Sequence, residues 1–310
     1  MSKPLDFFTY QSGSLTADDV SLTEVADMIG TPVYVYSASA FQTPLRELQK
    51  GLTGLDHLIC FAVKSNSNIA ILKLLAEAGA GMDLVSGGEL YRAQAAGVPG
   101  DRIVFSGVGK TPGEIVAALQ YDKNGILSFN VESVSELEMI NAVANELGVV
   151  AKVALRFNPD IDAKTHPYIS TGLKKNKFGM NRKEIIEVAR ALRNDPAHFS
   201  GLKIEGISIH IGSQLLSLTP LKASFIKLRE LVDELEEILP EPLRFLDLGG
   251  GMGITYKNEK PFPISKYCAL VHQYFGKKAK FKHPKRILLE PGRMISGNAG
   301  VLLTSVLFRK

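Results

Sequence analysis

The fold is decided by a unit that residues 59–85, ICFAVKSNSNIAILKLLAEAGAGMDLV, show in full. The apolar run Ile59–Val63 has the length of a strand that is buried on both faces, and Met82–Val85 is a second such run. Residues 67–78 between them have the pattern of a helix, and Gly79 is placed to end it. The stretch therefore predicts two parallel strands joined by a helix.

The same unit recurs along the chain. Apolar runs alternate with helical segments such as Pro220–Leu239, whose apolar residues form a single stripe. The runs are Ile59–Val63, Met82–Val85, Ile103–Phe105, Ile126–Phe129, Ala151–Phe157, Ile204–Ile209, Leu243–Leu248 and Ile287–Leu289. Such a series suggests a (β/α)8 barrel or a doubly wound sheet. Eight runs, spread over nearly the roughly 250 residues that such barrels need, favour the barrel.

Composition and charge narrow the class of protein. Apolar residues make up 45% of the 310 residues and charged residues 22%, which is typical of a globular chain. The net charge of +4 is too small, and the basic residues too scattered, to indicate a nucleic-acid-binding protein. We find no secretory signal and no run of roughly 18 apolar residues, so we expect a cytoplasmic protein and no membrane partner. Cys60 and Cys268 lie in apolar contexts, which predicts buried free thiols.

Polar side chains follow the apolar runs, at the strand ends where a barrel builds its active site. These residues are Lys64, Ser86 (with Asp83 before it), Ser106, Asn130, Arg156, His210, Gly249–Gly251 and Glu290. Each alone has an ordinary interpretation: a lysine that reaches solvent, a core histidine, or a surface ion pair between Glu290 and Arg293. Their shared position in the repeat points to one site.

Three of these features have a common chemistry. A lysine in a pocket, with its pKa lowered by desolvation, can form a Schiff base with a carbonyl. The glycines at 249–251 let backbone N–H groups approach an anion, and they lack the spacing of a dinucleotide fingerprint. Glu290 could accept a proton from a ring nitrogen. Together they describe a site for pyridoxal 5′-phosphate. The six histidines show no metal-binding spacing, so no metal is expected.

The motifs FAVKSN, GMDLVSGGEL, LRFNPD, HPYISTGLKKNKFGM, HIGSQ, LDLGGGMGI and EPGR occur in that order between Phe61 and Arg293. In them the chain resembles the fold-type III pyridoxal-phosphate-dependent decarboxylases, and within these the branch that acts on diaminopimelate. The resemblance implies an alanine racemase-like (β/α)8 barrel at 33–293. Residues 1–32 would pack with a β-domain, of which 294–310 would be the start.

The resemblance also implies roles for individual residues. Lys64 would carry the cofactor, His210 would stack on its ring, Glu290 would pair with the ring nitrogen, and Arg293 would also bind a substrate carboxylate. The remaining cofactor-binding residues would be Asp83, Arg156, Ser213, Gly250, Gly251, Pro291 and Gly292. Lys174–Phe178 would belong to a mobile loop near the site.

The resemblance further implies decarboxylation of meso-2,6-diaminopimelate to L-lysine and CO2, in a homodimer with active sites at the interface. Two alternatives stay open: a related amino-acid decarboxylase or racemase, and a barrel that binds pyridoxal phosphate without turnover. Relatives continue into a β-domain that supplies a Cys–Glu pair and a phosphate-binding Tyr. We read this chain as C-terminally truncated, with most of that domain absent, and expect the 310 residues alone to be inactive.

Overall fold

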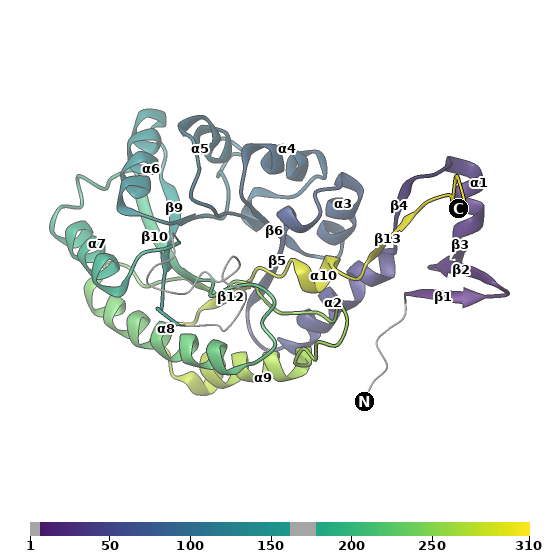
Figure 1. The fold of residues 1–310 in the computed structure, drawn as a ribbon. Coiled ribbons are helices and arrows are strands. Elements are labelled where there is room, and N and C mark those ends of the chain that lie inside the picture. Colours follow the sequence, from purple (N-terminus) through teal and green to yellow (C-terminus); the bar gives the residue numbers. More distant parts are fainter. Residues whose placement is uncertain (1–6, 162–177) are drawn as a thin grey trace.

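The computed structural model describes residues 7–161 and 178–310 (Figure 1). Most of the motif HPYISTGLKKNKFGM, and all of Lys174–Phe178 except Phe178, lie outside these residues. In the part described, no helix is long and apolar enough to cross a membrane.

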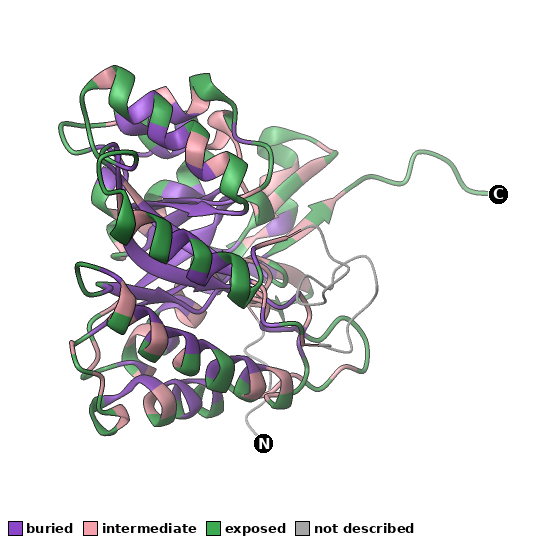
Figure 2. Cartoon of the chain, turned by 90° about the vertical axis from the view of Figure 1, so that its left-hand side faces the viewer, coloured by how far each residue is buried: buried purple, intermediate pink, exposed green. Residues whose placement is uncertain are grey.

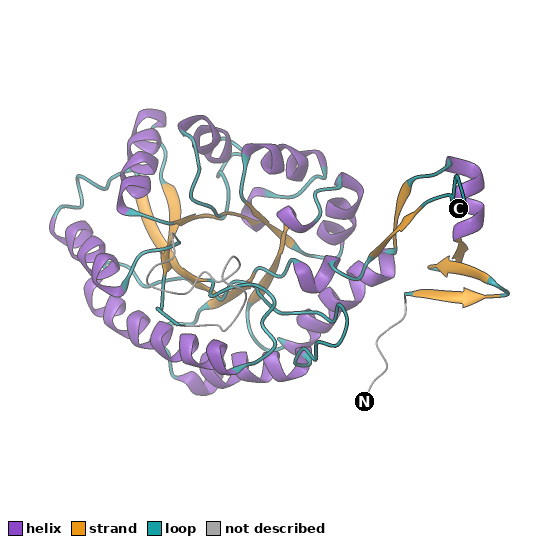
Figure 3. Cartoon of the chain, in the orientation of Figure 1, coloured by secondary structure: helices purple, strands orange, loops and turns teal. Residues whose placement is uncertain are grey.

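Eight parallel strands close into a barrel with helices around it, which confirms the predicted (β/α)8 fold (Figure 3). The strands are β5 (His57–Ala62), β6 (Gly81–Leu84), β7 (Ile103–Phe105), β8 (Ser128–Val131), β9 (Ala151–Phe157), β10 (Leu202–Ile209), β11 (Phe245–Asp247) and β12 (Arg286–Leu289). The ring closes where β12 pairs with β5, with Leu288 opposite Leu58. Each strand overlaps one of the predicted apolar runs. The doubly wound alternative is thereby excluded.

Helices cover the outside of the barrel. They are α2 (Ala38–Gly51), α3 (Ile69–Glu77), α4 (Gly87–Ala95), α5 (Pro112–Leu119), α6 (Val134–Leu147), α7 (Arg182–Asn194), α8 (Thr219–Ile238), α9 (Ile264–Phe275) and the short α10 (Arg293–Ser296). Short 3₁₀ turns lie at η1 (Val63–Ser65), η2 (Gly100–Arg102) and η3 (Lys277–Ala279). Local chemistry sets the ends: α5 begins at a Thr111–Glu114 capping box, and α6 ends at Gly148 with φ 66°.

The apolar core has two parts. The larger one lies between strands and helices, and the smaller one, which includes Leu58, Cys60, Val104 and Phe245, lies inside the barrel. Buried residues therefore follow the strands and the inner faces of the helices (Figure 2). Cys60 and Cys268 are both buried and free, as predicted.

Outside the barrel, β4 (Val33–Tyr36) pairs in antiparallel fashion with β13 (Gly300–Leu303). Residues 33–36, at the start of the range assigned to the barrel, thus join the chain end instead. The hairpin of β1 (Phe8–Gln11) and β2 (Ser14–Ala17), with β3 (Val20–Ser21) and α1 (Leu22–Ile29), lies beside this pair and away from the barrel (Figure 1).

Candidate active site

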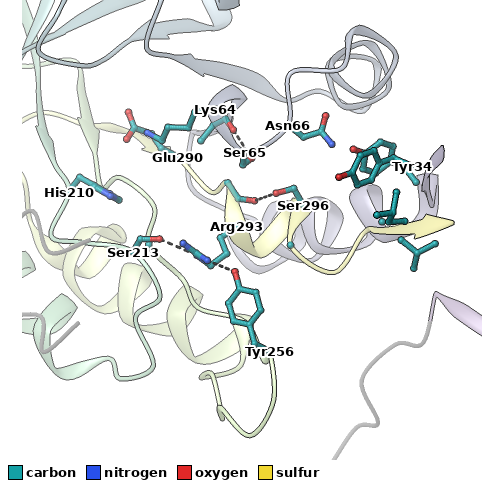
Figure 4. Close-up of a pocket in the computed structure, with 18 residues that line it drawn as sticks. Tyr34, Lys64, Ser65, Asn66, His210, Ser213, Tyr256, Glu290, Arg293 and Ser296 are labelled. Atoms are coloured by element: carbon teal, nitrogen blue, oxygen red, sulfur yellow. Dashed lines mark hydrogen bonds between the residues drawn. The ribbon is translucent and has the colours of Figure 1, made fainter. Parts of the chain in front are cut away.

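Two adjoining cavities lie at the carboxyl ends of the barrel strands. Their volumes are about 620 and 470 Å³, and both are lined by Lys64, His210, Ser213 and Glu290. The larger one also includes Gly251, Gly292 and Arg293, and the smaller one Arg156. The structure therefore brings most of the predicted site residues to one place, which Figure 4 shows. Asp83, Gly250 and Pro291 are buried and line neither cavity.

Lys64 stands in the η1 turn directly after β5, and its side chain is 54% exposed to the open cavity. Its Nζ lies 3.5 Å from Oδ2 of Asp83, a residue of β6 that is 1% exposed. The Asp83 carboxylate raises the pKa of Lys64, and this effect outweighs desolvation by burial. The prediction of a lowered pKa for Lys64 was therefore wrong in direction. Sequence spacing did not reveal that a buried carboxylate contacts the amine.

Glu290 follows β12 and faces a polar layer at the floor of the cavity. Its Oε1 accepts a hydrogen bond of 2.9 Å from Nδ2 of Asn130, and Ser106 Oγ lies 3.4 Å away. Asn130 Nδ2 is also 3.1 Å from Oδ2 of Asp247. Burial, reinforced by the charges of Asp247 and Asp83, holds the pKa of Glu290 well above its usual range.

His210, which follows β10, is held in one orientation by the glycine loop. The Gly250 N–H donates to its Nδ1 over 3.2 Å, so that Nδ1 carries no proton. Burial holds the pKa of His210 well below its usual range. The imidazole is thus neutral, and Gly250 acts on the histidine rather than on the cavity.

The glycine loop after β11 is too crowded for side chains. Gly251 has φ 97°, and a Cβ there would lie 2.2 Å from the carbonyl oxygen of Gly212. A Cβ on Gly250 would lie 2.1 Å from the carbonyl oxygen of Glu290. The glycines therefore let the loops after β10, β11 and β12 touch one another.

Arg293, at the start of α10, lies between Ser213 and Tyr256 (Figure 4). Its Nε donates to Ser213 Oγ over 3.2 Å, and a second nitrogen donates to the Tyr256 hydroxyl. Sequence reasoning missed Tyr256, although it stands only five residues after the glycine loop. Pro291 has a backbone role, because its carbonyl oxygen accepts from the Ala62 N–H of β5 over 3.2 Å.

Arg156, on β9, lines the smaller cavity and is anchored there. It donates to Oε1 of Glu132 over 2.5 Å, and the other oxygen of Glu132 accepts from the Gly179 N–H over 2.8 Å. The guanidinium also lies 5.0 Å from the centre of the Phe178 ring. Glu132 thus fixes both the Arg156 side chain and the backbone at Gly179. The sequence alone did not single out Glu132.

These residues fit pyridoxal phosphate, the cofactor that the sequence predicts. Two lining residues carry buried polar atoms, Oδ1 of Asn130 and Oγ of Ser208, with no hydrogen-bond partner among the described residues. Buried polar atoms of this kind need a partner, and a polar ligand supplies one. An amine, a neutral imidazole, a guanidinium and a carboxyl group all open on the same space. The described residues contain no group of three or more side chains arranged to hold a metal ion.

Comparison with known proteins agrees with this geometry. Residues 39–297 match the family described as pyridoxal-dependent decarboxylase, pyridoxal binding domain. The diaminopimelate decarboxylase of Pseudomonas fluorescens is 45% identical over 99% of this chain and 71% of its own length. That of Aquifex aeolicus is 44% identical over 98% of this chain and 69% of its own length.

Solved structures give the same result. Diaminopimelate decarboxylase from Helicobacter pylori, complexed with L-lysine, superposes with a TM-score of 0.84 at 40% identity, covering 93% of this chain and 70% of that one. The enzyme from m. jannaschi gives a TM-score of 0.85 at 36% identity, over 96% of this chain and 69% of that one. The matched motifs, the barrel and the lysine at its mouth therefore place the chain in the pyridoxal-dependent decarboxylase family, among the diaminopimelate decarboxylases.

Proposed function

We propose that this barrel binds pyridoxal phosphate through Lys64 and carries out the decarboxylation of meso-2,6-diaminopimelate to L-lysine and CO2. The observation that carries the proposal is the convergence of Lys64, His210, Glu290 and Arg293 on one cavity, in a chain that shares its family with diaminopimelate decarboxylases. When bound, pyridoxal phosphate supplies an electron sink for the bond that breaks at the α-carbon.

Lys64 supplies the amine of the site. Asp83 keeps the Nζ of Lys64 charged in the cofactor-free barrel, so that amine must lose a proton before it acts as a nucleophile. The cavity beside Lys64 gives that proton a route to water.

The other lining residues orient the ligands. The neutral His210 offers a flat ring, held by Gly250, against which the cofactor ring can stack. The backbone of Gly251 and the hydroxyl of Ser213 face the larger cavity, where they can bind phosphate. Arg293 presents a planar fork that suits a carboxylate or a phosphate. Arg156, fixed by Glu132, adds positive charge to the smaller cavity.

The alternative of a barrel that binds the cofactor without turnover is less consistent with the site. A carrier does not need an acidic group at the ring nitrogen, whereas this chain holds Glu290 at the floor of the cavity through Asn130 and Ser106, where it could serve as one. A related decarboxylase or racemase would use the same residues, so only the substrate assay separates it. The resemblance also implies a homodimer, and this prediction can be tested by measuring the mass of the protein in solution by analytical ultracentrifugation.

Two measurements test the proposal. Borohydride reduction of the cofactor-loaded chain, followed by peptide mapping, should place the pyridoxyl label on Lys64, and a label on another lysine would contradict the assignment. Lys73, which is exposed on α3, is the matched internal control and should stay unlabelled. CO2 release from meso-diaminopimelate is then measured with the full product of the gene. Release from ornithine or lysine in its place, or none at all, would refute the substrate.

A further inference from the structure

The floor of the site contains a pair of carboxyl groups. Asp247, the last residue of β11, is fully buried, and Glu290 follows the neighbouring strand β12. The Asn130 amide nitrogen lies 3.1 Å from Oδ2 of Asp247 and 2.9 Å from Oε1 of Glu290. Both carboxyl groups therefore meet at one side-chain nitrogen inside the barrel.

An ionised carboxylate only accepts hydrogen bonds, so two of them side by side depend on donors from the surrounding residues. The donors that reach the pair are few, and the Ser106 hydroxyl is one of them, since it donates to Oε1 of Glu290 over 3.4 Å. The Gly249 N–H donates to Oδ1 of Asp247 over 2.9 Å, and the Asn130 amide has two hydrogens for both carboxyl groups and Ser106. Few donors are thus left for two ionised carboxylates, which favours a proton on one of the two groups.

The charges around the pair favour the same state. Asp83 is a third carboxyl group nearby, and its charge raises the pKa of both Asp247 and Glu290. Lys64 is the cation that opposes this at Glu290, and its effect is smaller than that of either aspartate. Two carboxylates that share a desolvated site do not both ionise readily, so one keeps its proton to a raised pH.

We propose that Asp247 and Glu290 share one proton in the cofactor-free barrel, and that Glu290 passes it to the ring nitrogen of pyridoxal phosphate on binding. In this step the O–H bond on Glu290 breaks and an N–H bond forms, while the electron pair of the O–H bond stays on the Glu290 carboxylate. Asp247 is a positioning residue, because it acts through Glu290 and does not touch the cofactor. The inference rests on the proposed function, since it takes Glu290 as the partner of the ring nitrogen.

Infrared spectroscopy tests the first half without any turnover. The cofactor-free chain should show the C=O stretch of a protonated carboxyl group near neutral pH, with the shift in deuterium oxide that identifies such a group. Asp247→Asn removes a neighbouring negative charge, so the pH midpoint of this band should fall by about one unit or more. Glu205→Gln is the matched control, because Glu205 is also buried but is paired with Lys203 and Arg244. It should leave the band unchanged.

Loading with pyridoxal phosphate tests the second half. The band should disappear from the wild-type chain on binding. Isothermal titration calorimetry in two buffers of different ionisation enthalpy counts the protons exchanged with solvent. The pH is set between the midpoint of the infrared band in Asp247→Asn and that in the wild type. On binding the cofactor at this pH, Asp247→Asn should take up about one proton more from solvent than the wild type, because its Glu290 is already ionised.

The outcomes separate this inference from the proposed function. If the cofactor labels Lys64 but the cofactor-free chain shows no such band, or Asp247→Asn leaves its midpoint unmoved, the shared proton is wrong. If the band persists after loading, the transfer is wrong. If Lys64 is not labelled, the proposed function fails, whereas the band of the cofactor-free chain still tests the pair. The wild-type spectra decide the matter even if Asp247→Asn does not fold.

Discussion

Asp83→Asn should make the Lys64 amine easier to deprotonate. In the structure the two charged groups are 3.5 Å apart, the lysine side chain is 54% exposed and Asp83 is buried, so the dielectric of water gives the smallest effect to expect. At that distance Coulomb's law gives about 1.2 kcal/mol, which corresponds to roughly 0.9 pKa unit. Since the Asp83 carboxylate stabilises the charged amine, removing its charge lowers the pKa of Lys64. Any less complete screening by water would enlarge the shift.

The assay is the pH profile of acylation of Lys64 by a small amine-reactive reagent in the cofactor-free chain, followed by peptide mass spectrometry. The midpoint should fall by about one pH unit in Asp83→Asn. Asp56→Asn is the control, because Asp56 is exposed and precedes β5 at the opposite end of the barrel. It should leave the midpoint where it is, and the midpoint of Lys73 should stay constant in all three chains. An unchanged or raised midpoint for Lys64 in Asp83→Asn would refute the argument that this ion pair controls the amine.

Further predictions concern Glu290, Arg293 and Lys110. Glu290→Gln should lower kcat of the full gene product by on the order of 10²-fold, the scale of a lost electrostatic contact, and steady-state kinetics that show no loss would count against its role. The carboxyl group of Glu290 keeps its proton to a higher pH in the folded than in the unfolded chain, so folding stability is lost as the pH rises through that raised pKa. The loss is at most about 1.4 kcal/mol per pH unit, and urea denaturation of cofactor-free Glu290→Gln from about pH 5 to about pH 9 should show a flatter profile than the wild type. Arg293→Lys should raise KM or lower kcat, because an ammonium group cannot replace the fork that reaches both Ser213 and Tyr256, and unaltered constants would contradict this. Lys110→Met should lower the free energy of unfolding, measured by urea denaturation, by about 3 kcal/mol, because the buried ammonium donates to Glu136 and two backbone carbonyls. Lys73→Met, on the surface, is the control and should change the free energy of unfolding by less than about 0.5 kcal/mol.

The sequence predicted the barrel well because each of its strands is buried on both faces. Such strands read as short apolar runs, and Ile103–Phe105 and Ala151–Phe157 were located to the residue. Predicted ends were less accurate where a strand runs into polar residues: the run Ile126–Phe129 corresponds to a strand at 128–131 that includes Asn130. The pairing of β4 with β13 could not be predicted, since it joins residues more than 260 positions apart and nothing in either segment indicates which strand it pairs with.

The sequence predicted which residues gather at the site better than it predicted how their charges interact. Position at a strand end was enough to select Lys64, His210 and Glu290. Position alone could not show that Asp83 contacts Lys64, or that the Gly250 N–H donates its hydrogen bond to His210. Glu132 was missed because it touches the site through Arg156, and such a contact leaves no mark on local sequence. Tyr256 lines the larger cavity itself, but it stands in the loop between β11 and α9, so position at a strand end did not select it.

Closure of the sheet explains why the polar floor exists at all. Asn130 is on β8 and Asp247 on β11, and two strands of the ring, β9 and β10, separate them. In an open sheet with this strand order, side chains on these two strands would lie too far apart to touch. In the barrel they face each other across the interior, where the Asn130 amide reaches Asp247 over 3.1 Å. The same closure brings Glu290 and Asp83 to that interior. Three carboxyl groups are thereby buried close together, where few hydrogen-bond donors are available to stabilise their charges. The proton assigned to the Asp247–Glu290 pair is therefore a consequence of the fold.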